Sequence, residues 1–236
     1  MSSTFFQRWL AICFLSMSFS LAYGQEYLYE IGGMAGGAFY MGDVNKTALF
    51  KGLNPSAGVV FRYNANFRIA FKGSLTWATV SGTTEGLDNV FPNGAQASFS
   101  RSLFELGGQF EYNFFPYSDK FAYLNTKRLS PYFLVGIGVT AAPDGEAFAG
   151  MNLPVGAGIK YKLKNRLNIG CEFSVRKLFG DGLDVTNESN RLLNSPYGIS
   201  SSMMKNKDWY SLLLFSVTWD FGPRNRQCNS TDGVLY

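Results

Sequence analysis

The chain has 236 residues, of which 17% are aromatic and only 16% are charged, and it contains 26 glycines. A typical soluble domain carries roughly 25% charged residues, so this composition favours a sheet with one face against lipid. The formal net charge is +4 and there is no histidine. These counts argue against a nucleic-acid partner, a Ser-His nucleophile and a histidine-ligated metal.

The N-terminus has the pattern of a secretory signal peptide. Arg8 precedes an apolar stretch over 9–21, and the small residues Ala22 and Gly24 follow it. We predict a signal peptide over 1–24 that is cleaved before Gln25. An uncleaved membrane anchor is the alternative, but the apolar run is shorter than the roughly 20 residues that a spanning helix needs.

Apolar side chains occupy every second position from Leu167 to Val175, with polar or small residues between them. The same alternation returns from Trp209 to Phe221. Because side chains alternate across a strand, each such segment has one apolar face and one polar or small face. We predict eight strands in the mature chain, over 27–41, 55–64, 67–80, 98–114, 131–141, 151–163, 166–178 and 209–222.

These strands are long enough to cross a bilayer when tilted, and eight of them close into a barrel filled by side chains. We therefore predict an all-β fold, a transmembrane antiparallel up-and-down β-barrel over 25–222 in a bacterial outer membrane. Segment 194–204 has room for another hairpin arm, so ten strands are the structural alternative. Composition alone leaves a soluble β-sandwich open.

The links between the predicted strands differ in length. If both ends of the barrel chain are periplasmic, segments 42–54, 81–97, 142–150 and 179–208 lie outside the cell. The links 64–66, 115–130 and 164–165 and a tail over 223–236 then lie in the periplasm. Short periplasmic turns and longer outer loops are the usual asymmetry of such barrels. Only link 115–130 is long for a periplasmic turn.

The alternation places many charged side chains on the inward faces, where we expect them to pair across the interior. A structural plug of ion pairs is the favoured interpretation. A conducting pore or ligand channel is the alternative, but an eight-strand lumen is too narrow for a wide water channel. The predicted plug consists of Glu30, Arg62, Arg68, Arg101, Glu105, Glu172 and Arg176, and the other polar inward positions are Lys72, Gln109, Glu111, Lys160, Lys162 and Asp220.

No catalytic constellation is present in the sequence. The paired glycines near 136–138 and 156–158 are not followed by a helix, so the context of a nucleotide loop is missing. Asp181, Asp184 and Glu188 cluster in the longest outer segment. Calcium binding there is conceivable, but the spacing lacks an EF-hand pattern and solvated loop charge is favoured. We predict no catalytic, cofactor-binding or metal-ligating residues.

Several segments resemble the PorG-like family, which consists of outer-membrane barrels of Bacteroidetes associated with the type IX secretion system. The resemblance covers essentially the whole mature chain, and its stretches FGDGLD and DFGPRNR are more specific than a generic barrel pattern. The matching segments are EIGGMAGG at 30–37, FFPYS at 114–118, TKRLSPY at 126–132, KNRLNIGCEF at 164–173, KLFGDGLDV at 177–185, NKDWY at 206–210 and WDFGPRNR at 219–226.

The resemblance implies a non-enzymatic role in protein transport. Family members are thought to connect the outer membrane to a periplasmic ring built from a lipoprotein and its soluble partner. Charge and predicted side suggest which residues meet that ring, because basic residues gather on the periplasmic links and tail. A basic rim also suits anionic lipid headgroups, so both interpretations stay open. The predicted docking residues are Lys127, Arg128, Lys164, Arg166, Arg224 and Arg226.

The leading hypothesis is therefore a structural component of a secretion apparatus, a plugged barrel whose periplasmic face docks an assembly. The alternative is a small outer-membrane transport barrel, or one that binds a ligand at the surface through its outer loops. An outer-membrane enzyme is a third possibility, which the missing histidine disfavours.

Overall fold

The structure of the protein is a computed structural model that describes residues 27–41, 53–83, 98–119, 125–144, 147–164, 166–179 and 209–222. The signal peptide predicted over 1–24, the tail over 223–236 and the acidic cluster at Asp181, Asp184 and Glu188 lie outside the described residues. Those assignments stay predictions. Among the described residues, no helix has the length and hydropathy needed to cross a bilayer.

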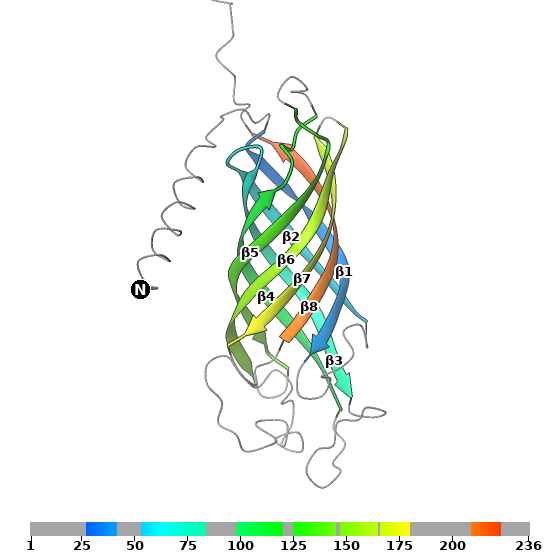
Figure 1. The fold of residues 1–236 in the computed structure, drawn as a ribbon. Helices are drawn as coiled ribbons and strands as arrows, with labels where there is room; N and C mark the ends of the chain where they lie inside the picture. Colours follow the sequence, from blue (N-terminus) through cyan, green and yellow to red (C-terminus); the bar gives the residue numbers. More distant parts are fainter. Residues whose placement is uncertain are drawn as a thin grey trace, which may run out of the picture.

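Eight strands follow one another in chain order, and every bound lies within three residues of the prediction from alternation. Each strand pairs antiparallel with the next (Figure 1). The strands are β1 (Tyr29–Met41), β2 (Asn54–Asn64), β3 (Ile69–Thr83), β4 (Ser98–Asn113), β5 (Leu129–Ala142), β6 (Phe148–Lys164), β7 (Leu167–Leu178) and β8 (Trp209–Phe221).

The first and last strands pair with each other and close the sheet. Their register runs from Tyr29 opposite Phe221 to Met41 opposite Trp209. The closed order β1 to β8 leaves no sheet edge for further strands, so the ten-strand alternative is wrong, and so is an open β-sandwich. Closure also satisfies the backbone hydrogen bonds between strands, which a sheet in hydrocarbon requires.

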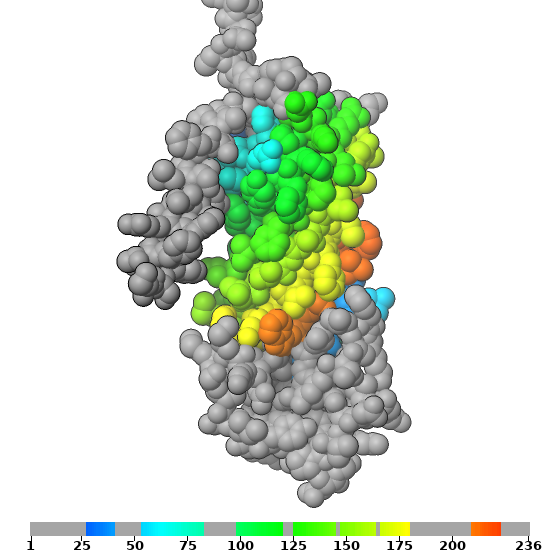
Figure 2. Space-filling model, viewed as in Figure 1, coloured from blue at the N-terminus to red at the C-terminus, as the bar shows by residue number. Residues whose placement is uncertain are grey.

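The wall of the barrel is apolar on its outer face. In β4, Glu105 is fully buried, whereas its neighbour Leu106 is 66% exposed. Ile137 of β5 is 63% exposed between two inward glycines. Figure 2 shows this wall in chain order, passing from green through yellow to orange. An apolar belt around a closed barrel is the surface that a lipid bilayer covers.

One end of the barrel carries the tight turns. The turn at 65–68 joins β2 to β3, and β7 begins at Leu167, three positions after β6 ends at Lys164. Tyr29 and Phe221, where the barrel chain begins and ends, lie at the same end (top of Figure 1). Three of the four connections at the opposite end span twelve residues or more, whereas only the β4–β5 link does so at this end. Outer-membrane barrels have short turns on the periplasmic side, so the turn-bearing end is the periplasmic end and the other is the outer end.

The interior is not uniformly polar, which corrects the expectation from alternation. Toward the outer end the inward side chains form an apolar cluster around Leu103, Leu178 and Leu212. Tyr40 and Phe99 pack there edge to face, with ring centroids 4.7 Å apart. Near this end β8 is apolar on both faces, with Leu212 inward and Leu213 outward, and β4 is apolar inward at Leu103 with serines outward. Polarity alone therefore does not mark the inward side of these strands. Charged side chains gather instead in the middle of the barrel and toward the periplasmic end.

Candidate functional site

Glu111 on β4 is the centre of the buried ion pairs. Arg62 on β2 binds it with two hydrogen bonds, Nε to Oε2 at 2.8 Å and Nη2 to Oε1 at 3.1 Å. Lys160 on β6 donates to the same Oε2 at 2.7 Å, and the Lys72 ammonium lies 3.8 Å from Oε1. Arg62 also donates to Glu30 at 2.5 Å. Three strands thus supply cations to one carboxylate that is fully buried.

Two further carboxylates extend this network across the barrel. Lys72 on β3 donates to Glu172 on β7 at 2.5 Å, and the Tyr132 hydroxyl donates to the same oxygen at 2.8 Å. Asp220 on β8 accepts from Lys162 at 2.5 Å. These contacts join strands that are not neighbours in the sheet, so they cross the lumen. Paired and hydrogen-bonded charges are the form in which buried ionic groups are tolerated.

A separate ion pair lies between this network and the apolar cluster. Arg176 on β7 donates from Nε to Glu105 on β4 at 3.0 Å. Glu105 also accepts a hydrogen bond from Tyr210, whose hydroxyl lies 2.8 Å from Oγ1 of Thr140. With this pair, ion pairs in the interior join five carboxylates to five cations among the described residues. The network is therefore electrically balanced.

Tyr117, from the link between β4 and β5, closes the periplasmic mouth. Its backbone N–H donates to the carbonyl of Phe67 at 3.0 Å, which fixes the link against the β2–β3 turn. The side chain is 6% exposed, and its hydroxyl donates to Oδ1 of Asn168 on β7 at 3.1 Å. The ammonium groups of Lys160 and Lys162 lie 5.6 and 5.5 Å from its ring centroid. The long periplasmic link thus contributes part of the plug.

The Tyr117 hydroxyl is held in its neutral form. Burial raises the pKa of this phenol well above its ordinary value of 10.0, and the carboxylate of Glu30 raises it further. A neutral phenol keeps its proton for the hydrogen bond to Asn168. Tyr117 lies outside the alternating strands, and for that reason the alternation did not predict it as part of the plug. The unusual length of link 115–130 was the available signal.

The structure brings five of the seven predicted plug residues into the ion-pair network: Glu30, Arg62, Glu105, Glu172 and Arg176. Arg101 is also buried inside, but further toward the outer end, where its Nη2 donates to the carbonyl of Ala142 at 2.8 Å.

The assignment of Arg68 to the plug is wrong. Arg68 lies in the β2–β3 turn, and its Nη1 donates to the carbonyl of Phe114 at 2.9 Å. The reason is local, because Oδ1 of Asn66 accepts from the backbone N–H groups of Arg68 and Ile69, each at 2.8 Å. This side-chain cap bends the chain, so β3 begins at Ile69 and the alternation does not extend back to Arg68. The guanidinium is therefore at the periplasmic rim.

Four of the predicted docking residues lie at the periplasmic end. Lys127 and Arg128 are exposed just before β5, and Lys164 is the last residue of β6. Arg166 is exposed before β7, where its Nε donates to the Tyr27 hydroxyl at 2.9 Å. The Lys127 ammonium lies 4.3 Å from the ring centroid of Phe115. We call these four residues the basic rim. Arg224 and Arg226 lie outside the described residues.

The geometry indicates that the interior charged groups stabilise the barrel. The interior carboxylates are neutralised by cations at hydrogen-bond distance, and the described residues hold no cluster of acidic or cysteine side chains able to bind a metal. Lys127, Arg128 and Arg166 of the rim, in contrast, are exposed and present positive charge to the aqueous phase. The arrangement is suited to sealing the barrel and to meeting an anionic surface at the periplasmic end.

A comparison with known protein families identifies the family of this chain. Residues 7–230 match the family described as Domain of unknown function (DUF6089). The chain belongs to this family. A search among curated proteins found no match for this DUF6089 member.

Several solved structures are similar to the DUF6089 barrel at very low sequence identity. Neisserial surface protein A is 11% identical with a TM-score of 0.50, over 82% of this chain and 97% of that protein. OprG of Pseudomonas aeruginosa is 10% identical with a TM-score of 0.46, over 85% and 98%. Ail of Yersinia pestis is 12% identical with a TM-score of 0.43, over 84% and 99%. The likeness to Neisserial surface protein A, at 11% identity, shows the fold alone.

The closed eight-strand wall and its apolar outer face give the location of the protein. The eight described strands pair in a ring, and large apolar side chains of these strands are exposed on its outside. Bacterial barrels of this construction lie in the outer membrane. The protein is an outer-membrane β-barrel.

Proposed function

We propose that this barrel is a non-enzymatic component of a protein secretion apparatus of type IX, and that it docks a periplasmic ring to the outer membrane. The observation that carries the proposal is the contrast between a sealed interior and an exposed basic rim at the periplasmic end. The resemblance of the sequence to the PorG-like family supports the identity of the apparatus. The expected partners are the ring lipoprotein and its soluble partner.

The interior favours a role that uses the outside of the barrel. Tyr117 occupies the periplasmic mouth, ion pairs cross the middle, and the apolar cluster fills the outer half. An eight-strand barrel has an interior just wide enough for side chains to fill. This packing disfavours the alternative of a solute channel. The interior carboxylates are bound to cations, which disfavours a role as acid or base in catalysis.

The rim has the chemistry of a docking surface. The described basic-rim residues lie at the starts or ends of β5, β6 and β7, which are consecutive in the barrel wall. Backbone contacts connect them to this wall, since Lys162 donates to the carbonyl of Arg128 at 2.9 Å and Asp220 donates to that of Arg166 at 2.7 Å. A rigid array of positive charge attracts an acidic partner and orients it.

Charge reversal tests the proposal. We expect the double variant K127E/R128E to lose most of its co-purification with the periplasmic ring, because attraction is replaced by repulsion. The matched control is K46E/K51E, which makes the same charge change on a segment that the sequence places at the outer end. Recovery of the ring proteins is measured by quantitative mass spectrometry at two salt concentrations. Equal recovery of the ring with both double variants would contradict the proposed contact.

A further inference from the structure

We propose that the outer wall holds one phospholipid of the periplasmic leaflet, with an acyl chain in a hollow over β3, β4 and β5 and its phosphate at Arg68. This site lies on the lipid-facing side of the barrel, whereas the docking proposal concerns the basic rim in the aqueous phase. The two proposals are independent, and the experiments below measure lipid and not the ring.

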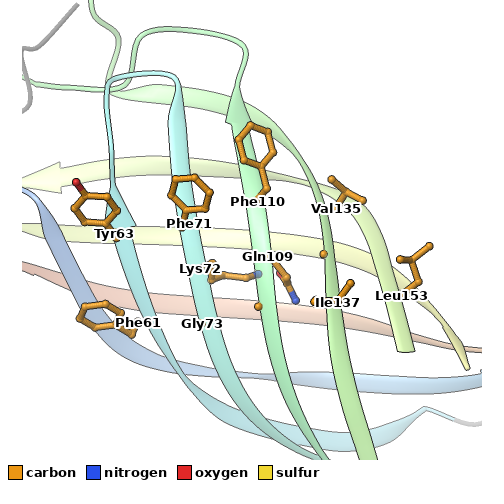
Figure 3. A pocket seen from close by; sticks show the side chains of 12 residues that line it. Phe61, Tyr63, Phe71, Lys72, Gly73, Gln109, Phe110, Val135, Ile137 and Leu153 are labelled. Carbon is orange, nitrogen blue, oxygen red and sulfur yellow. The ribbon is translucent and has the colours of Figure 1, made fainter. Parts of the chain in front are cut away.

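The hollow is an open apolar depression of about 680 Å³ in the wall. Figure 3 shows Phe61 on one side of it, Val135, Ile137 and Leu153 on the other, and the rings of Phe71 and Phe110 near the β2–β3 turn. Volumes of roughly 300–1,000 Å³ are usual for sites that hold small molecules. The apolar lining matches a hydrocarbon chain, which is the material that surrounds this surface in the membrane.

Two glycines that face each other across a strand pair form the floor. Gly73 of β3 is in register with Gly108 of β4, and both point outward. A Cβ atom added at either position would find its nearest neighbour at 4.0 Å, so the floor is open space. Next to it, the β5–β6 pairing passes from Val135 opposite Val155 to Gly138 opposite Asn152. Pro154, which lacks a backbone N–H, lies in this interval of β6.

The hollow leads to a positive charge at the membrane surface. From the floor, the outward pairs on β3 and β4 are Phe71 with Phe110 and then Ile69 with Tyr112. Arg68 follows directly, about 16 Å along the chain from Gly73 at the strand rise of about 3.3 Å per residue. Its Nη1 is bound to the carbonyl of Phe114, which fixes the guanidinium at the rim. Other N–H groups of the same guanidinium suit a phosphate oxygen.

The positive charge at Arg68 and the depth of the hollow in the membrane indicate the class of ligand. The guanidinium of Arg68 is held at this edge by the carbonyl of Phe114, so a headgroup with a negative phosphate is favoured there. Apolar surface alone gives no preference in a bilayer, because lipid tails are as apolar as the wall. Retention therefore depends on dispersion contacts in the hollow together with the phosphate at Arg68. The tight turn beside the hollow places this headgroup in the periplasmic leaflet.

Native mass spectrometry of the purified barrel tests the site, with dioleoyl-phosphatidylglycerol and dioleoylglycerol as probes. We expect one bound phosphatidylglycerol per barrel and about tenfold weaker retention of dioleoylglycerol, which lacks the phosphate. G108L fills the floor and R68Q removes the cation, so each is expected to lower phosphatidylglycerol retention by about tenfold.

Matched controls separate the site from the rest of the surface. Gly33 also points outward, and a Cβ added there would meet only Gly58 O at 3.9 Å, but Gly33 does not line the hollow. Arg166 follows the β6–β7 turn, four strands around the wall from Arg68. We expect G33L and R166Q to retain the lipid as the parent does, and all variants to keep the heat-dependent gel shift of a folded barrel.

Three results would overturn the site. Unchanged phosphatidylglycerol retention in G108L and R68Q is the first, and equal retention of dioleoylglycerol by the parent is the second. In the third, G108L loses a co-purifying membrane protein but keeps the lipid, which would assign the hollow to a protein partner.

Discussion

The two halves of the barrel interior fill the same narrow space with different chemistry. Near the periplasmic end, Glu111 lies among Arg62, Lys160 and Lys72. Near the outer end, Leu103 and Leu212 lie in an apolar cluster. Both halves exclude solvent. The charged half does so through partners at fixed positions on several strands, whereas the apolar half needs only volume and shape. The halves should therefore respond differently to substitution.

The difference also bears on function. Charged side chains that cross the lumen tie distant strands together beneath the basic rim, for example Lys72 on β3 with Glu172 on β7. A rim held on a rigid wall keeps its charges in one arrangement.

The largest effect is expected in the charged half. E111Q removes the negative charge that Arg62 and Lys160 share, and so leaves buried cations insufficiently paired. Breaking a buried ion pair by removing one partner costs about 3–5 kcal/mol. Urea unfolding in lipid vesicles, followed by tryptophan fluorescence, measures the free energy of unfolding. The control is D144N at an exposed position of the outer end. If E111Q destabilises no more than D144N, the ion pairs do not stabilise the barrel.

A smaller effect is expected in the apolar half, where the size of the side chain decides. L103A leaves a cavity at a fully buried position, with an expected loss of about 2–4 kcal/mol. L103M nearly conserves the volume, and its loss is expected to stay below about 1.5 kcal/mol. The same urea titration measures both. Equal losses for the two variants would show that packing does not govern this half.

The smallest effect is expected at Tyr117, which closes the periplasmic mouth. Y117F removes only the hydroxyl that donates to Asn168, with an expected loss of about 1 kcal/mol. The folded pKa of this phenol is raised, so its contribution is fully present below pH 10 and is lost as pH rises through the folded value. In an alkaline absorbance titration, the parent should show one late-ionising tyrosine more than Y117F. Identical titrations would contradict the buried position of this hydroxyl.

Most of the fold was predictable from the sequence because alternation is a local signal. Strands such as β7 carry the pattern over most of their length, from Leu167 to Val175, and the number and approximate bounds of the strands follow from it. The pattern fails where a side chain bends the backbone, as Asn66 does before β3, and for that reason Arg68 was placed inside. The apolar outer half was missed because residues such as Leu212 and Leu214 are inward yet apolar.

The site was predictable only in part, because its contacts join residues far apart in the sequence. Alternation identified Glu111 and Lys160 as inward, but their meeting depends on the stagger of β4 against β6 across the lumen. Tyr117 and Asn168 are 51 positions apart, and neither local sequence predicts the hydrogen bond between them. The basic rim was easier to predict, because it needs only the side of the membrane on which each link lies.

Crosslinking in cells tests the docking claim most directly. A photo-reactive amino acid at Arg128, on the basic rim, is compared with one at Lys177, near the outer end of β7. The account predicts that position 128 captures the ring lipoprotein or its soluble partner and that position 177 captures neither. Capture of the same proteins from both positions, or of no ring protein from position 128, would contradict it.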